Sequence, residues 1–156
     1  MNSLEFTESQ DKISIKQVDY SDLLVRKGIQ TLNRDIFTDE LIDTSGDNKC
    51  LWWIVLVGGQ VAGYCSIKEL EPGVGCLSRA GVLPEFRGRG LQKLMITTRI
   101  NKARQLGWKF VVTDTHKDNV ASYTSLQRMG FEEFTPKNPW VNPAWARVSK
   151  FWKIEL

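Results

Sequence analysis

A glycine-rich turn at residues 82–92 holds the residue types and spacing best suited to chemistry. The turn reads VLPEFRGRGLQ, with glycines at 88 and 90 and arginines at 87 and 89. Glycine lets the backbone approach a ligand closely. A helix that begins just after this turn would offer amide donors and the positive end of its dipole, and the arginines would add charge. We therefore predict that the turn binds a phosphate-sized anion.

Three kinds of phosphate-binding loop compete for this assignment. A P-loop requires G-x-x-x-x-G-K-[ST], and no such run occurs in the sequence. The Rossmann fingerprint requires three spaced glycines early in a β-α-β unit and an acidic residue about 20 residues later, and this pattern also fails. A loop for the diphosphate of coenzyme A remains.

The elements that must position the turn follow from hydrophobic periodicity and capping signals. Alternating or β-branched runs predict strands at residues 13–18, 51–57, 61–68, 74–83, 110–112 and 145–154. Helical periodicity predicts helices at 22–32, capped by Ser21, at 91–106, ended by Gly107, and at 121–129, capped by Asn119 and ended by Gly130. A short helix near 39–42 and turns at 46–48, 58–59 and 72–73 complete the prediction.

Length and composition are those of one ordinary globular domain. The chain has 156 residues, of which 42% are hydrophobic and 25% charged. Its three cysteines form no CxxC pair, so neither a disulfide framework nor a metal site is indicated. The acidic N-terminal residues lack the pattern of a signal peptide, and the longest apolar run, 50–57, is too short to cross a bilayer. We expect a cytoplasmic protein without a membrane partner.

Charge is distributed unevenly along the chain. Residues 1–50 hold six Lys and Arg against ten Asp and Glu, whereas residues 84–110 hold seven against one. A run of basic residues is often only the solvated face of a helix, and that interpretation stays open for 102–109. Aromatic residues are not interleaved with the basic ones, which disfavours a nucleic-acid-binding surface.

The turn and its surroundings resemble a known family. Residues 80–92, AGVLPEFRGRGLQ, look like motif A of the GNAT superfamily of N-acetyltransferases, whose signature is Q/R-x-x-G-x-G/A after V-x-P-E-aromatic. Arg87 and Gly90 match this signature, while Gln92 departs at the last position. A second stretch, in which Asn119 caps a helix that ends in Gly130 and Phe131, is similar to the family's second signature. The order of the predicted elements also fits the family.

The resemblance implies an α/β fold of the α+β type, with a mixed, splayed sheet of about six to seven strands flanked by helices. It implies one acyl-CoA N-acyltransferase domain over residues 1–156, with acetyl-coenzyme A as cosubstrate. The pantetheine arm would enter between the strands that end at Val82 and Thr115. The residues expected to bind the coenzyme are Val82, Leu83, Arg87, Gly88, Arg89, Gly90, Leu91, Gln92 and Asn119. The Gln92 side chain is expected to weaken binding without abolishing it.

The same resemblance leaves the catalytic groups unassigned. The family often places a proton-donating Tyr seven residues after the motif Asn, and that position is Leu126. It often places a catalytic Glu six residues before the motif Val, and that position is Cys76. We predict His116, the only histidine, as the base, and Tyr123, one helical turn before Leu126, as the donor. The alternatives are a loop histidine bonded to the Asn119 turn and a packed tyrosine.

Two further features bear on the acceptor. Cys76 and Ser78 share a face by alternation and are candidates to line the amine site, with Cys76 as an acyl carrier the weaker alternative because buried thiols usually belong to the core. The segment 136–145, PKNPWVNPAW, has three prolines and two tryptophans. Such a stiff aromatic stretch suits either a loop over an acceptor site or a seal on the edge of the sheet.

These patterns together predict an N-acetyltransferase that transfers acetyl to a primary amine by direct attack on the thioester. The acceptor is a small-molecule or peptide amine, and no motif identifies it further. A coenzyme A-binding module without transferase activity is the alternative function. Neither nucleic acid nor a metal is expected as a partner, and a homodimer stays open.

Overall fold

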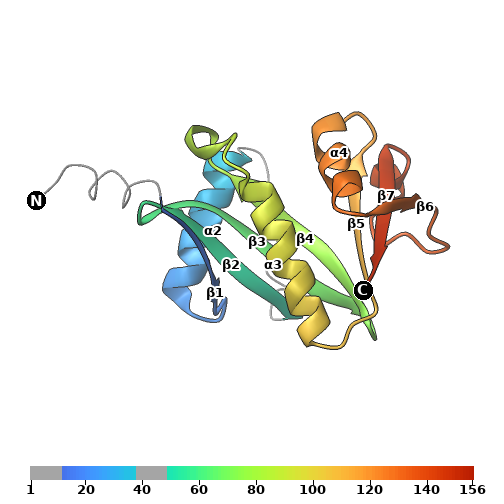
Figure 1. The fold of residues 1–156 in the computed structure, drawn as a ribbon, viewed down its shortest axis with the longest axis horizontal. Coiled ribbons are helices and arrows are strands. Elements are labelled where there is room, and N and C mark those ends of the chain that lie inside the picture. Colours follow the sequence, from blue (N-terminus) through green and yellow to red (C-terminus); the bar gives the residue numbers. More distant parts are fainter. Residues whose placement is uncertain (1–11, 38–48) are drawn as a thin grey trace, which may run out of the picture. The chain divides into compact units, whose positions relative to one another are not determined.

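The computed structural model describes residues 12–37 and 49–156 (Figure 1). In chain order the elements are β1 (Ile13–Val18), α2 (Leu23–Ile36), β2 (Cys50–Val57), β3 (Gln60–Glu71), β4 (Val74–Val82), η2 (Pro84–Phe86), α3 (Leu91–Gln105), β5 (Phe110–His116), α4 (Val120–Arg128), β6 (Glu132–Phe134), α5 (Pro143–Ala146) and β7 (Ser149–Glu155). The seven strands form one sheet in the order β1-β2-β3-β4-β5-β7-β6. Because β4 and β5 run parallel while β5 and β7 run antiparallel, the predicted mixed sheet is confirmed.

The chain divides into two compact units whose boundaries fall inside β3, β4 and α3. The first unit comprises Met1–Lys68 and Ser78–Arg99, and the second comprises Glu69–Leu77 and Ile100–Leu156. Each unit therefore takes part of the same three elements. The single domain expected over residues 1–156 stays a prediction.

In the first unit, β1, β2 and β3 form an antiparallel meander. β1 pairs with β2 from Ile13 opposite Val57 to Val18 opposite Trp52, and β2 pairs with β3. The turn between β2 and β3 has φ angles of 57° at Gly58 and 83° at Gly59. Positive φ at both residues is what a primed hairpin turn requires, so the predicted turn is confirmed.

Helix α2 begins one residue later than predicted and has a different cap. Asp22 is the N-cap, and its Oδ1 accepts from the backbone N–H of Leu24 at 2.9 Å and of Val25 at 3.4 Å. The predicted cap, Ser21, instead donates its hydroxyl and its backbone N–H to the Asp19 carboxylate, which lowers the pKa of Asp19. A carboxylate at the cap is the stronger acceptor for the first-turn amides, which explains the correction. The helix and turn predicted at 39–42 and 46–48 lie outside the described residues.

In the first unit, β2 and β3 bury side chains on both of their faces, each face against a different helix. Tyr20, Trp52 and Tyr64 stack in series, with ring centroids 4.4 and 6.2 Å apart, and Ile29 of α2 completes this cluster. Because side chains alternate along a strand, Cys65 faces the other side from Tyr64. Burial raises the pKa of Cys65 to about 11, an effect that a nearby cation of α3, Arg99, partly opposes.

Arg99 is a buried cation that fixes α3 on the first unit's strands. Its side chain is 2% exposed, and its guanidinium donates to the carbonyls of Met95 at 3.0 Å, Ser66 at 3.1 Å and Arg79 at 3.3 Å. These carbonyl acceptors replace the hydrogen bonds to water that the guanidinium loses on burial. The helix that follows the glycine-rich turn is therefore held by β3 and β4 through specific hydrogen bonds.

In the second unit, β7 pairs with both β5 and β6. β5 pairs antiparallel with β7 from Phe110 opposite Glu155 to His116 opposite Ser149, and β6 pairs with β7 on its other edge. The start of β4 pairs with β5 only from Val74 opposite Phe110 to Cys76 opposite Val112. β5 thus continues four residues beyond the strand predicted at 110–112.

The last strand predicted, 145–154, is wrong at its start. Pro143–Ala146 form the short helix α5, and β7 begins only at Ser149. Asn142 caps this helix by accepting from the Trp145 N–H at 2.8 Å, and Pro143 occupies the first turn. Proline has no N–H to donate to a ladder and suits the first turn of a helix, so the chain turns here instead of extending. The strand β6 was not predicted at all.

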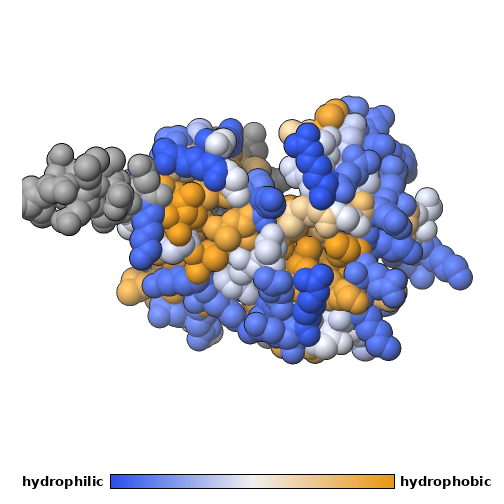
Figure 2. Space-filling model, viewed as in Figure 1, coloured by the Kyte–Doolittle hydropathy of each residue, from blue (hydrophilic) through white to orange (hydrophobic). Residues whose placement is uncertain are grey.

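No helix in residues 12–37 and 49–156 is long and apolar enough to cross a membrane. Within the same two ranges no group of three His, Cys, Asp or Glu residues is arranged to hold a metal ion. Hydrophilic residues predominate on the face shown in Figure 2, with apolar residues visible between them.

Candidate active site

The glycine-rich turn connects the end of β4 at Val82 to the start of α3 at Leu91. Just after β4, the Leu83 N–H donates to the Ala62 carbonyl of β3 at 2.8 Å. The single turn η2 follows and buries Phe86, which anchors the segment. Gly88 and Gly90 then adopt φ angles of 79° and 77°, and α3 begins at Leu91, which is buried. The predicted order of strand, glycine-rich turn and helix is confirmed.

Both glycines are required by backbone conformation and not by lack of space. A Cβ atom built at Gly88 or Gly90 would meet no heavy atom of the described chain within 4 Å. Side-chain-bearing residues rarely adopt φ near +80°, so glycine is the residue that allows this path. The open space above the same backbone gives a ligand room to approach. The first amides of α3 have no partner within the helix, which makes them donors for an anion.

The two arginines of the turn hold different positions. The Arg87 Nε donates to the Val82 carbonyl at 3.4 Å, which folds this side chain back along its own segment. The Arg89 guanidinium lies 5.5 Å from the centre of the Phe86 ring. Both residues are exposed, so their charge stays near the turn without burial. Gln92 is exposed as well, while its neighbour Leu91 packs inward.

Asn119 caps α4 as predicted. Its side-chain oxygen accepts from the Ser122 N–H at 3.2 Å, and its backbone N–H donates to the His116 carbonyl at 3.0 Å. Gly130, with φ of 99°, follows the helix, and the Phe131 N–H donates to the Leu126 carbonyl at 3.0 Å. This is the glycine stop that the sequence indicated. Binding of the pantetheine arm by Asn119 stays a prediction.

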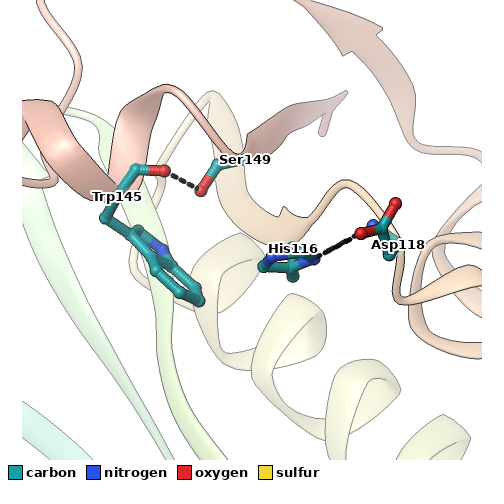
Figure 3. A network of polar contacts seen from close by, with 4 residues as sticks. All are labelled: His116, Asp118, Trp145 and Ser149. Carbon is teal, nitrogen blue, oxygen red and sulfur yellow. Dashed lines mark hydrogen bonds and ion pairs between the residues drawn. The ribbon is translucent and has the colours of Figure 1, made fainter.

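His116 ends β5 and is held by the turn that follows. Its Nδ1 accepts from the Asp118 N–H at 3.1 Å and lies 3.8 Å from the Asp118 Oδ2 (Figure 3). A neutral imidazole that accepts at Nδ1 carries its proton on Nε2 and is a donor there. To act as a base at Nε2, the ring must move its proton to Nδ1 and direct it at the Asp118 carboxylate.

Tyr123 packs on α4 against the second unit's strands. Its ring stacks on Trp152 of β7 with centroids 5.8 Å apart, and the Lys150 ammonium lies 5.1 Å from the ring centre. The Trp152 indole in turn donates to the Thr115 hydroxyl at 3.0 Å. Leu126, at the position where the resembling family often carries Tyr, is buried. The observed contacts of Tyr123 are thus those of a packed side chain. Its role as a proton donor stays a prediction.

The two predicted catalytic side chains lie on opposite faces of the β5–β7 pair. Thr115 shares its face with Trp152 and hence with Tyr123, whereas His116, the next residue along β5, points the other way. The imidazole instead lies beside Trp145 of α5, with ring centroids 5.8 Å apart (Figure 3). One proton relay through both residues is thus not supported by this arrangement.

Asp114, an acidic residue that the sequence analysis missed, lies on the same face of β5 as His116. Asp114 of β5 accepts the indole N–H of Trp140 at Oδ1, 3.0 Å, and that of Trp145 at Oδ2, 2.8 Å. We call Asp114, His116, Trp140 and Trp145 the Trp–carboxylate cluster. Extending the alternation of β5 past Val112 would have placed Asp114 on one face with His116. The tryptophans of the proline-rich segment therefore do more than cover an edge.

The remaining candidates lie on β4. Cys76 is buried, and it is paired in register with Val112. The Ser78 hydroxyl is 2.7 Å from the Ser66 hydroxyl, so it already shares a hydrogen bond within the first unit. Neither arrangement adds a nucleophile to the site, and the lining of an amine site by these residues stays a prediction.

Comparisons with known proteins agree with this geometry. The family model described as Acetyltransferase (GNAT) family matches residues 18–131, and no curated protein sequence matches the chain. Among solved structures, an acetyltransferase from Bacillus subtilis in complex with CoA is 15% identical, with a TM-score of 0.74 over 93% of this chain and 99% of that one. The ribosomal-protein-S18-alanine N-acetyltransferase from Escherichia coli is 14% identical, with a TM-score of 0.70 over 92% and 94% of the two chains. An IAA acetyltransferase from Bacillus cereus is 16% identical, with a TM-score of 0.70 over 93% and 100%.

Proposed function

Because the chain belongs to the acetyltransferase (GNAT) family, we propose that it is an N-acetyltransferase that transfers the acetyl group of acetyl-coenzyme A to a primary amine. The observation that carries the proposal is the turn at Gly88 and Gly90. It combines positive φ, open space and the first amides of α3 within the segment that the family model covers. Bound acetyl-coenzyme A would supply the activated acetyl group as a thioester.

The residues of the turn suit a diphosphate. The amides from Gly88 to Gln92 would donate to it, and Arg87 and Arg89 would add positive charge. The backbone groups of Val82 and Leu83 would hold the pantetheine arm, as in the resembling family. The Bacillus subtilis acetyltransferase, which has a similar fold, is in complex with CoA, and this supports the same ligand class here.

The chemistry requires a neutral amine and a proton for the leaving thiolate. The nitrogen lone pair attacks the carbonyl carbon, the C–N bond forms and the C–S bond breaks. For a lysine-like amine, loss of the ammonium proton at pH 7 costs about 4.6 kcal/mol, whereas an α-amine costs only about 1 kcal/mol. A base on the protein therefore matters most for an acceptor of high pKa.

His116 is proposed as the base and Tyr123 as the donor, acting separately. The Asp118 Oδ2 lies 3.8 Å from the His116 Nδ1. When Nε2 takes a proton from the amine, the Asp118 carboxylate would stabilise the imidazolium that forms, with the Nδ1–H directed at it. Tyr123 has its ring fixed by Trp152, so its hydroxyl position is set by packing. Because they lie on opposite faces of the β5–β7 pair, the two roles are proposed and tested independently.

The test is a thiol-release assay over a panel of amines, with mass spectrometry of the products. The proposal expects free coenzyme A to accumulate in step with an acceptor that gains one acetyl group. The alternative, a coenzyme A-binding module, expects acetyl-coenzyme A to bind without amine-dependent thiol release. Calorimetric binding together with an absence of turnover on every amine would favour the alternative.

A further inference from the structure

The Asp114 carboxylate of the Trp–carboxylate cluster makes no ion pair with the described residues. Within residues 12–37 and 49–156, Lys150 pairs with Glu133, and His116 pairs with Asp118 when its imidazole is protonated; neither pair includes Asp114. Lys150 lies against Tyr123, on the opposite face of the strands. Lys153 lies on the same face as Asp114, where its ammonium is 5.1 Å from the centre of the Phe134 ring. The only side-chain donors to Asp114 in these residues are two neutral indoles. The carboxylate is thus oriented by two neutral donors and forms no ion pair in this part of the chain.

The carboxylate also keeps capacity for another donor. An ionised carboxylate offers about four lone-pair positions, and the two indoles occupy two of them. Asp114 is half-buried, and Trp145 is 41% exposed, so this part of the cluster is in contact with solvent. A cation at this place could interact with the charge of the carboxylate and with the negative face of the exposed indole ring.

The cluster is rigid before any ligand arrives. Trp140 stacks on Phe134 with centroids 6.2 Å apart and meets the edge of Phe151 at 5.1 Å. Trp145 is fixed by its place in α5, where the Asn142 cap holds its N–H and the Ser149 hydroxyl donates to its carbonyl at 2.7 Å (Figure 3). A carboxylate and ring held in place in advance bind a ligand with less loss of side-chain freedom.

We propose that the Trp–carboxylate cluster binds a positively charged group of the acceptor and thereby selects amines that carry a second positive charge. The bound charge is distinct from the reacting nitrogen, because a carboxylate stabilises an ammonium while the attack needs a neutral amine. This inference rests on the proposed acetyl transfer and names the class of its acceptor: a diamine, or an amine with a cationic group elsewhere in the molecule.

Binding is tested with α,ω-diamines of increasing chain length, each beside the amino alcohol of the same length. Nuclear magnetic resonance follows the indole N–H signals of Trp140 and Trp145, assigned with Trp→Phe variants. We expect a diamine to shift both signals in a saturable way and the matched amino alcohol to bind at least about tenfold more weakly. Equal shifts with both ligands, or none with either, would overturn the inference.

Two variants separate recognition from folding. Asp114→Asn removes the charge and should lower the ratio of kcat/KM for the preferred diamine to kcat/KM for the matched amino alcohol about tenfold or more. Trp145→Phe keeps a ring and the Asp114 charge, and should retain most of the diamine preference. The matched control is Glu155→Gln, which removes an exposed charge at the other end of the β5–β7 pair and should leave the preference unchanged.

Failure of this inference is distinguishable from failure of the proposed function. Thiol release with equal kcat/KM for diamine and amino alcohol, unaltered by Asp114→Asn, overturns the charge selection and leaves acetyl transfer standing. Diamine-dependent indole shifts without any thiol release would overturn the acetyl transfer while leaving a cation site. If Asp114→Asn does not fold, the diamine-to-amino-alcohol ratio and the indole shifts of the unaltered protein decide the question.

Discussion

The glycine-rich turn and the Trp–carboxylate cluster are built by opposite means. At the turn, backbone conformation makes the proposed diphosphate site: two glycines at positive φ and the first amides of α3. At the cluster, side chains make the site: one carboxylate and two indoles, positioned by β5 and the segment before β7. A backbone site survives wide change in sequence, whereas a side-chain site varies with each residue. We therefore expect the turn to persist among relatives that share the fold at 14–16% identity, and the cluster to differ between them.

The largest effect is expected at His116, in the side-chain region. His116→Gln should lower kcat about a hundredfold for an acceptor of high pKa, because no group then removes the ammonium proton. The coenzyme dissociation constant should stay unchanged. Asp118→Asn should give a smaller fall, because it removes the acceptor for the Nδ1 proton. Rates for both variants are measured from about pH 6 to about pH 9; parental rates throughout would refute the base role.

The backbone region is tested by Gly90→Asp. A side chain at this φ strains the turn, and its charge repels a diphosphate, so acetyl-coenzyme A should bind at least about tenfold more weakly by calorimetry. Gly73→Asp is the matched control, because Gly73 has φ of 81° and equally open space in a different turn. Similar losses of affinity in the two variants would place the diphosphate elsewhere.

A smaller effect is expected from Tyr123→Phe, which tests the donor on the opposite face. The Phe ring keeps the stack on Trp152, so the fold should be preserved. As donor to the leaving thiolate, the hydroxyl should contribute about tenfold to kcat, with the coenzyme dissociation constant unaltered. Stopped-flow measurement of a single turnover checks the chemical step directly. A single-turnover rate equal to the parent would leave Tyr123 with packing alone.

The smallest effect concerns stability of the side-chain region. Trp145→Phe removes one indole donor from a half-exposed carboxylate and should lower the free energy of unfolding by about 1 kcal/mol. Ser149→Ala, which removes the hydroxyl bonded to the Trp145 carbonyl, should cost less. Urea denaturation measures both. A loss at Ser149 larger than that at Trp145 would mean that the backbone, not the indole bond, holds this segment.

The same contrast explains what the sequence could predict. Gly88, Gly90 and the Asn119 cap are local signals, because positive φ and capping depend on a few neighbouring residues. The mixed sheet was expected from the family resemblance that these motifs carry. Strand β6 has three residues and exists through its pairing with β7, so its own residues gave no period to detect.

The cluster was missed for a related reason. The residues after Val112 are polar and carry no local strand signal, and pairing with β7 extends β5 through His116. Asn142 and Pro143 are typical of the start of a helix, and here they do begin α5. The nearby tryptophans, which are common in strands, favoured the wrong prediction of a strand from residue 145. The approach of Trp140 and Trp145 to Asp114 depends on tertiary packing across about 30 residues of chain, which no local pattern encodes.

One measurement tests the division between the two regions most directly: initial rates of thiol release while acetyl-coenzyme A and a diamine are varied in turn. The account predicts turnover by the unaltered protein, a raised KM for acetyl-coenzyme A alone in Gly90→Asp, and a raised KM for the diamine alone in Asp114→Asn. An absence of turnover, or variants that each raise both constants equally, would contradict it.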